Sequence, residues 1–246
     1  MDRWNGKIAV VTGASGGIGL AVSKILLEHG MIVVGLARRR DKMIDEIKNC
    51  KNSKNFHARE CDITIEENII QSFDYIKSTF GQLNVLINNA GTTSMKKIED
   101  SSTDEIEKIV KVNLLGVVYC SKKAIKLMRE NSMEAHILNI NSVLGHRVPP
   151  PIFGHFNIYP ATKFAVTALS ESLQYDLLDS KIRVTNISPG AVKTDMLDHA
   201  VQHAPLMSQL PELSPDDIAN SIVFALSVPP HVEISELTIQ GKKMDF

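Results

Sequence analysis

The chain has 246 residues, of which 43% are hydrophobic and 22% charged, and its formal net charge is −1. This length suits one α/β domain over residues 1–246 with a sizeable core, and the near-neutral charge excludes a global attraction to nucleic acid or an anionic membrane. Three widely spaced cysteines, a charged amino terminus and short apolar runs predict a cytoplasmic protein with reduced thiols, no metal site, no secretory signal and no membrane span.

Short β-branched runs alternate with longer segments of helical period along the chain. The predicted strands are Lys7–Thr12, Met31–Leu36, Asn55–Arg59, Asn84–Asn88, Ala135–Ile140, Arg183–Ile187 and Leu237–Ile239. The predicted helices are Ile18–His29, Lys42–Asn49, Glu66–Phe80, Asp104–Val112, Leu114–Glu130, Ala161–Leu178 and Asp216–Leu226. Near-continuous apolar strands that alternate with helices predict an α/β fold: a doubly wound parallel sheet of about seven strands with helices on both faces.

Two segments interrupt this alternation. Gly145–Phe156 contains three consecutive prolines, which exclude regular helix and interior strand. Lys193–Pro211 is poorly periodic and carries Met196, Leu197 and Met207. Irregular segments of this length in a compact domain are often lids or binding loops, so we expect both to lie near a ligand.

A glycine-rich turn, Thr12-Gly13-Ala14-Ser15-Gly16-Gly17-Ile18-Gly19, directly follows the first predicted strand and opens the first predicted helix. Glycines at this place let a dinucleotide pyrophosphate approach backbone N–H groups at the positive end of a helix. The strand–turn–helix–strand context favours a dinucleotide site over a turn that is merely rich in glycine. The turn therefore predicts a Rossmann fold.

The end of the second predicted strand bears on which dinucleotide binds. An NAD-binding fold places an acid there, about 20 residues after the turn, to hold the ribose 2′-hydroxyl. Here Ala37 is followed by Arg38, Arg39 and Arg40, and guanidinium groups suit the 2′-phosphate that an acid would repel. Asp41 is expected to cap the following helix. We therefore predict NADP(H) as the cofactor, held by Arg38 and Arg39.

A candidate reacting centre lies further along the chain. Tyr159 and Lys163 are four residues apart and would share one face of a helix. A nearby ammonium favours phenolate, so it would lower the tyrosine pKa toward a value useful for proton transfer. Ser142 follows a predicted strand, at the sheet edge where α/β folds bind ligands. A Tyr/Lys pair at this spacing also occurs by chance, so the interpretation depends on all of these motifs together.

Taken in order, the motifs resemble the short-chain dehydrogenase/reductase family over essentially the whole chain. The matching residues are Gly13, Gly17, Gly19, Asp62, Asn88-Asn89-Ala90-Gly91, Asn113, Ser142, Tyr159, Lys163 and Pro189-Gly190. The opening MDRW before GKIAVVTGAS resembles the insect farnesol dehydrogenase group, which is similar to the vertebrate family-member-eleven reductases. The spacing from Ser142 to Tyr159 is longer than the common pattern, and we interpret the excess as a loop insertion on the substrate side.

The resemblance implies a role for each residue. Tyr159 would act as general acid in reduction and as base in oxidation, while Lys163 would bind the nicotinamide ribose and Ser142 would orient the substrate oxygen. Asn113 would hold a water that links Lys163 to solvent. The alternative is that Asn113 only kinks the helix that it interrupts. The implied cofactor residues are Gly13, Ser15, Gly17, Ile18, Gly19, Asp62, Ile63, Asn89, Ala90, Gly91, Tyr159, Lys163, Pro189, Gly190, Val192 and Thr194. For Asp62, a helix cap near Thr64 is the structural alternative.

The candidate substrate wall is mostly apolar and rich in methionine. It consists of Ser94, Met95, Val143, Leu144, Phe153, Met196, Leu197 and Met207. Such a wall favours a hydrophobic alcohol, ketone or aldehyde, such as an isoprenoid, a steroid or an aliphatic carbonyl compound. We therefore predict an NADP-dependent alcohol dehydrogenase or carbonyl reductase.

Three other functions were weighed against this prediction. A methyltransferase could share the glycine turn but would not need Tyr159, Lys163 and the arginines together. A sugar-nucleotide epimerase would need a different glycine spacing and a second domain, which this length does not allow. A non-catalytic NADPH-binding sensor is the alternative from another class, and the complete catalytic set argues against it. The family resemblance also implies a homodimer or homotetramer built on Leu114–Glu130 and Ala161–Leu178.

Overall fold

The computed structural model describes residues 1–131 and 133–242. Within these ranges, seven strands form one fully parallel sheet in the order β3-β2-β1-β4-β5-β6-β7. The strands are β1 (Ile8–Thr12), β2 (Ile32–Ala37), β3 (Phe56–Glu60), β4 (Val85–Asn88), β5 (Ala135–Ile140), β6 (Ile182–Pro189) and β7 (Glu236–Ile239). The predicted α/β fold class is confirmed, and the chain order reverses between β1 and β4, where such sheets bind ligands.

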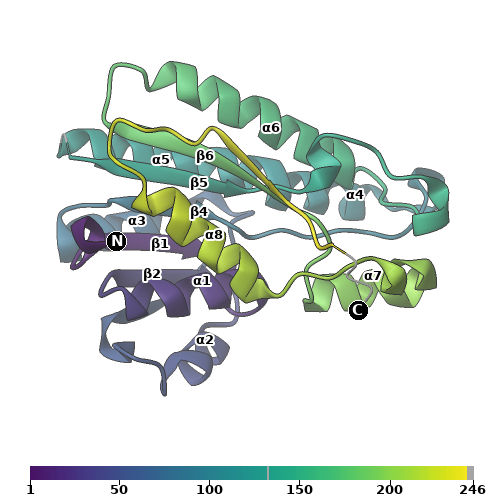
Figure 1. Ribbon diagram of the computed structural model, residues 1–246, viewed down its shortest axis with the longest axis horizontal. Coiled ribbons are helices and arrows are strands. Elements are labelled where there is room, and N and C mark those ends of the chain that lie inside the picture. Colours follow the sequence, from purple (N-terminus) through teal and green to yellow (C-terminus); the bar gives the residue numbers. More distant parts are fainter. Residues whose placement is uncertain (132, 243–246) are drawn as a thin grey trace.

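Helices cover both faces of the sheet (Figure 1). They are α1 (Gly17–Glu28), α2 (Arg40–Ile47), α3 (Glu66–Phe80), α4 (Thr103–Val110), α5 (Gly116–Glu130), α6 (Tyr159–Asp176), α7 (Asp195–His203) and α8 (Pro215–Ser227). Successive residues of β1 point to opposite faces. Ala9 and Val11 pack with α1, α2 and α8, whereas Ile8 and Val10 pack with α3, α5 and α6. The apolar runs of the inner strands therefore supply two cores.

Arg3 and Trp4, near the start of the chain, form hydrogen bonds with the end of α8. Trp4 is 2% exposed, and its indole N–H donates to the Leu226 carbonyl at 2.8 Å. The Arg3 guanidinium donates to the carbonyls of Leu226 and Val228. The MDRW opening therefore has a structural role at the base of β1.

Three local predictions need correction or refinement. Lys193–Pro211 is not irregular, because it contains α7 and a 3₁₀ helix over Pro205–Gln209. Asp41 lies inside the first turn of α2, whose N-cap position is Arg39, so it does not cap that helix. Gly145–Phe156 is irregular apart from short 3₁₀ turns. In the part of the chain that the structure describes, no helix combines the length and apolar character needed to cross a membrane.

Candidate active site

A cavity of about 920 Å³ opens at the carboxyl edge of the sheet. Its lining includes most of the sequence-predicted residues. These are Gly13, Ser15, Gly17, Ile18, Arg38, Arg39, Asp62, Ile63, Asn89, Ala90, Gly91, Ser142, Val143, Leu144, Phe153, Tyr159, Lys163, Pro189, Gly190, Val192, Thr194, Met196, Leu197 and Met207. Four predicted residues lie outside the lining: Gly19, Asn113, Ser94 and Met95.

The glycine turn is shaped by close contacts that exclude side chains. A Cβ at Gly13 would lie 2.9 Å from the Ala90 Cα, and one at Gly19 would lie 2.5 Å from the Gly13 carbonyl oxygen. Gly19 therefore packs beneath the turn rather than lining the cavity. Gly17 has a φ of +51°, and α1 begins there without a side-chain cap. Uncapped N–H groups beside a cavity with no side chain in the way fit an anionic phosphate.

Thr12 joins the glycine turn to the segment after β4. Its hydroxyl accepts hydrogen bonds from the backbone N–H groups of Asn89 and Ala90, both at 3.0 Å. The Asn89 amide donates to the Thr12 carbonyl at 2.9 Å. These bonds fix Asn89, Ala90 and Gly91 as one wall of the cavity.

Two arginines face the far end of this wall. The Arg39 guanidinium donates to the Ser15 hydroxyl of the glycine turn at 3.3 Å. Burial raises the pKa of Asp62, but hydrogen bonds from Thr64 and the charge of Arg38 outweigh it and lower this pKa. Arg40 is absent from the lining and donates to the Ala58 carbonyl. Arg38 and Arg39, but not Arg40, therefore give this part of the cavity a positive charge.

Asp62 both stabilises the turn at Thr64 and lines the cavity, so the two roles expected from the sequence are compatible. Its carboxylate accepts hydrogen bonds from the backbone N–H and the hydroxyl of Thr64, at 2.9 and 2.7 Å. It also lines the cavity. The carboxylate closes the turn that precedes α3, and the helix itself begins at Glu66.

Tyr159, Ser142 and Lys163 meet at the centre of the cavity. Ser142 follows β5 and accepts a hydrogen bond from the Leu144 N–H at 3.1 Å, which orients its hydroxyl. Tyr159 opens α6, and Lys163 follows one turn later. The Lys163 ammonium lies 5.7 Å from the Tyr159 ring centre and donates to the Ile140 carbonyl at 2.9 Å. All three side chains are buried, with exposed fractions of 5–9%.

The expected lowering of the tyrosine pKa is wrong for this arrangement. Burial raises the pKa of Tyr159 to about 12, against a smaller opposing effect of the hydrogen bond with Ser142. Burial also lowers the pKa of Lys163 to about 8. A charged form costs free energy away from water, and this cost is the largest cause of both shifts. The phenol is therefore protonated at neutral pH.

Asn113 lies in a π-helical turn, Lys111–Leu115, that joins α4 to α5. Its side-chain amide accepts from the Thr92 N–H at 2.8 Å and donates to the Thr92 carbonyl at 2.9 Å. The same amide nitrogen donates to the Thr162 hydroxyl at 3.2 Å, beside Lys163 in α6. Its side chain thus ties the cavity wall at Thr92 to the helix that carries Tyr159.

The substrate wall differs from the sequence prediction at two positions. Ser94 donates to the Glu105 carboxylate at 2.8 Å, because its hydroxyl turns toward α4 instead of the cavity. Met95 is buried behind the wall, in a cluster with Leu197 and Met207. The other six residues line the cavity, and α7 contributes Met196 and Leu197.

Sequence reasoning missed several lining residues. They include Cys61, Thr92, Lys108, Val112, Phe156 and Ala200. Thr92 directly follows the predicted Asn89–Gly91 segment, so extending that motif would have found it. Lys108 and Val112 reach the cavity from the α4 region, and no local motif marks them.

The chain resembles known proteins over most of its length. A family model described as short chain dehydrogenase matches residues 7–205. The chain is similar to the farnesol dehydrogenase of Aedes aegypti, with 41% identity over 248 residues and 98% of each chain covered. It is also similar to dehydrogenase/reductase SDR family member 11 of Bos taurus, with 38% identity over 251 residues and 98% coverage of both. The solved alcohol dehydrogenase from Thermococcus sibiricus complexed with 5-hydroxy-NADP has a TM-score of 0.83 and 26% identity, over 98% of this chain and 99% of that one.

Proposed function

The chain belongs to the short-chain dehydrogenase family, and we propose that it is an NADP(H)-dependent oxidoreductase acting on hydrophobic alcohols or carbonyl compounds. One observation carries the proposal. Tyr159, Ser142 and Lys163 lie buried together in a cavity whose other end combines a glycine cradle with Arg38 and Arg39. These are the groups that reversible proton transfer beside a bound dinucleotide requires.

The bound nicotinamide supplies or accepts the hydride. The glycine turn is proposed to hold the pyrophosphate on the uncapped N-terminus of α1. Arg38 and Arg39 are assigned to the 2′-phosphate, since two guanidinium groups at this end favour NADP(H) over NAD(H). Asp62 and Ile63 are assigned to the adenine, Asn89–Gly91 to its ribose, and the segment from Pro189 to Thr194 to the nicotinamide.

The chemistry at the substrate oxygen is assigned to three side chains. The protonated phenol of Tyr159 donates the proton in carbonyl reduction and accepts it in alcohol oxidation. The Ser142 hydroxyl orients the substrate oxygen beside that phenol. Lys163 binds the nicotinamide ribose, and its ammonium group is a second proton donor close to Tyr159. Asn113 is assigned to the water path that returns protons from solvent.

The substrate assignment rests on the wall of the cavity. Phe153, Met196, Leu197 and Met207 form an apolar surface, and methionine side chains adapt to varied shapes. A farnesol-like isoprenoid, a ketosteroid or another hydrophobic carbonyl compound fits this lining. The similarity to a protein named farnesol dehydrogenase agrees with that class.

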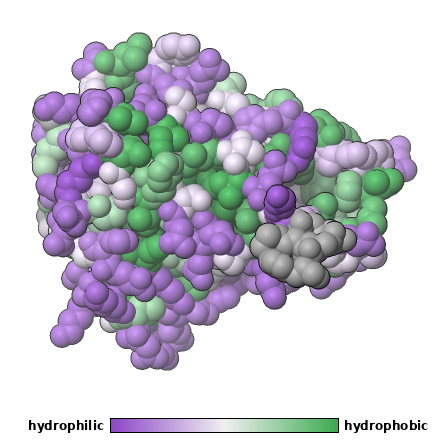
Figure 2. Space-filling view, in the orientation of Figure 1, coloured by the Kyte–Doolittle hydropathy of each residue, from purple (hydrophilic) through white to green (hydrophobic). Residues whose placement is uncertain are grey.

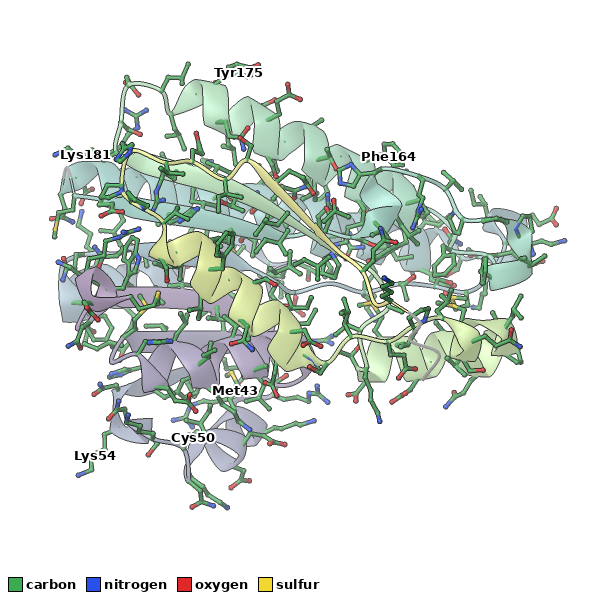
Figure 3. All side chains as sticks on the ribbon, viewed as in Figure 1. Met43, Cys50, Lys54, Phe164, Tyr175 and Lys181 are labelled. Carbon is green, nitrogen blue, oxygen red and sulfur yellow. The ribbon has the colours of Figure 1, made fainter. Side chains whose placement is uncertain are left out.

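A homo-oligomer built on α5 and α6 is part of the proposal. Phe164 and Tyr175 lie on the outer side of α6 (Figure 3), with exposed fractions of 43% and 66%, and Leu178 follows at 78%. The spacing of Phe164 and Tyr175 places them on one face of α6, and Leu178 lies just beyond the end of that helix. Large apolar side chains repeated on one face favour contact with a second copy. Size-exclusion chromatography with light scattering tests this part.

Initial-rate spectroscopy tests the function itself. Purified protein is given NADP(H) or NAD(H) with farnesol, ketosteroids, aromatic diketones and aliphatic alcohols, and the absorbance of the reduced nicotinamide is followed. We expect turnover of at least one hydrophobic class, faster with NADP(H). Tight NADPH binding without turnover of any compound would favour the non-catalytic sensor instead.

A further inference from the structure

A second hollow, of about 640 Å³, lies beside the catalytic cavity. One wall is the turn that carries Lys97, Ile98 and Glu99, and the other is the proline-containing loop between β5 and α6. Its lining consists of Lys97, Ile98, Glu99, Val148, Pro149, Pro151, Gly154, His155, Phe156, Asn157 and Pro160. The unusually long segment between Ser142 and Tyr159 therefore builds most of this hollow, which we call the distal groove.

The distal groove adjoins the catalytic cavity. Val148, Pro149 and Phe156 line both hollows, so these three residues form their common border. The Phe156 ring centre lies 6.5 Å from that of Tyr159. A long substrate with its oxygen at Tyr159 would have to pass Phe156 to reach the groove.

The walls of the groove are held in place by contacts outside it. Gly154 has a φ of +94°, and a Cβ there would lie 2.7 Å from the Met95 methyl and 2.9 Å from the Ala204 Cβ. The loop is therefore pressed against the end of α7. On the other side, the Asn157 amide donates to the Lys96 carbonyl and to the Ser101 hydroxyl. These contacts fix the position of both walls of the groove.

The groove presents apolar surface without net charge. Val148 and Ile98 are 71% and 63% exposed, although both are large aliphatic side chains. Lys97 and Glu99 form an ion pair at 3.5 Å, so their charges offset each other. Hydrophobic side chains are visible at the end of the molecule that carries this loop and α7 (Figure 2). The chemistry suits an uncharged hydrocarbon chain better than a polar or ionic group.

We propose that the distal groove is a subsite for the far hydrocarbon end of an elongated substrate whose reacting oxygen lies at Tyr159. The inference rests on the proposed function and adds that chain length, not only polarity, selects the substrate. Ile98 and Val148 are its specificity-determining residues, one on each wall. Small alcohols or ketones occupy the catalytic cavity alone and do not reach Ile98, which lines only the groove.

A series of linear alcohols, from butanol through octanol to dodecanol, together with farnesol, tests the subsite. For the wild-type enzyme with NADP⁺, kcat/KM should rise with chain length, by up to about fourfold for each methylene that becomes buried. Ile98→Asp should lower kcat/KM for dodecanol and farnesol at least about tenfold, because a carboxylate would face the hydrocarbon chain. Its kcat/KM for butanol should change less than about twofold, since Ile98 does not line the catalytic cavity. Val148→Asp, on the opposite wall, should also lower kcat/KM for the long alcohols.

Ile152→Asp is the matched control, because Ile152 lies in the same loop, is 64% exposed and lines neither hollow. It should keep the wild-type length profile. A flat profile in an active wild-type enzyme, or equal losses for butanol and dodecanol in Ile98→Asp, would overturn the subsite and leave the proposed function standing. Absence of turnover with every alcohol, with the corresponding aldehydes and with both cofactors would instead overturn the proposed function, and the subsite with it.

Discussion

The Lys163 ammonium lies 5.7 Å from the centre of the Tyr159 ring, and its hydrogen bond goes to the Ile140 carbonyl rather than to an acid. The two side chains share one face of α6 because they are one helical turn apart. Burial raises the pKa of the phenol to about 12 and lowers that of the ammonium to about 8. The Tyr159 phenol is therefore in its proton-donating form at neutral pH.

The two reaction directions should differ in their dependence on pH. Reduction needs the protonated phenol, which persists throughout the neutral range because the Tyr159 pKa is raised to about 12. Its kcat/KM should stay level up to mildly alkaline pH. Oxidation needs the deprotonated form, so its kcat/KM should rise with pH, by up to about tenfold per unit. Initial rates in both directions across one pH series measure this. A shared midpoint near neutrality would contradict a raised phenol pKa.

Lys163 should reduce the stability of the fold at neutral pH. Its pKa of about 8 lies below the ordinary 10.5, so the unfolded chain binds more protons between these values, and stability rises with pH across that window. We expect Lys163→Met to abolish turnover yet unfold with a free energy roughly 1–3 kcal/mol higher at neutral pH. The difference should shrink as the pH rises through 8 toward 10.5. Urea unfolding at several pH values checks this; a less stable variant with a pH-independent difference would contradict it.

Arg38 should discriminate between the two nicotinamide cofactors. Arg38→Asp should weaken NADPH binding about 10–100-fold more than NADH binding, because a charge-assisted hydrogen bond is replaced by repulsion. Fluorescence titration of both cofactors measures the two affinities. Arg40→Asp is the matched control, since Arg40 turns toward the Ala58 carbonyl, and it should leave the NADPH/NADH ratio unchanged. Equal weakening of both cofactors by Arg38→Asp would contradict the 2′-phosphate assignment.

The glycine turn offers a matched pair of variants. A Cβ at Gly19 would lie 2.5 Å from the Gly13 carbonyl oxygen, so Gly19→Ala should cost about 1–3 kcal/mol and lower Tm by roughly 2–4 °C per kcal/mol. Gly16 has nothing within 4 Å of an added Cβ, so Gly16→Ala should leave Tm unchanged. Thermal unfolding of both variants measures the two Tm values. Similar Tm values for the two would contradict the packing account of the turn.

Local patterns were sufficient to predict the fold and much of the cavity lining. The glycine turn, the arginines after β2 and the Tyr159/Lys163 spacing are each encoded within a few residues, and alternating apolar runs predicted all seven strands found in the described ranges. α7 was not predicted because its buried side, Leu197 and Ala200, packs against side chains that are distant in sequence, such as Met95. No local apolar pattern indicates that contact.

Other features depend on burial and contacts between distant segments. No sequence pattern shows that the Tyr159 phenol is removed from water, so the sign of its pKa shift was predicted wrongly. Ser94 was expected in the substrate wall, but its hydroxyl is drawn away by Glu105. The distal groove likewise arises where two loops distant in sequence meet, and the prolines indicated only that one of them is irregular.

The most direct test of the account compares wild-type protein with Tyr159→Phe, using NADPH and whichever hydrophobic carbonyl compound the wild type reduces fastest. The substitution removes the proton donor and keeps the ring, so turnover should fall about 10²–10⁴-fold or more while NADPH affinity and Tm stay close to wild type. That combination would establish Tyr159 as the proton donor of an oxidoreductase. Turnover at the wild-type rate in Tyr159→Phe would remove the phenol from the reaction and contradict the central claim.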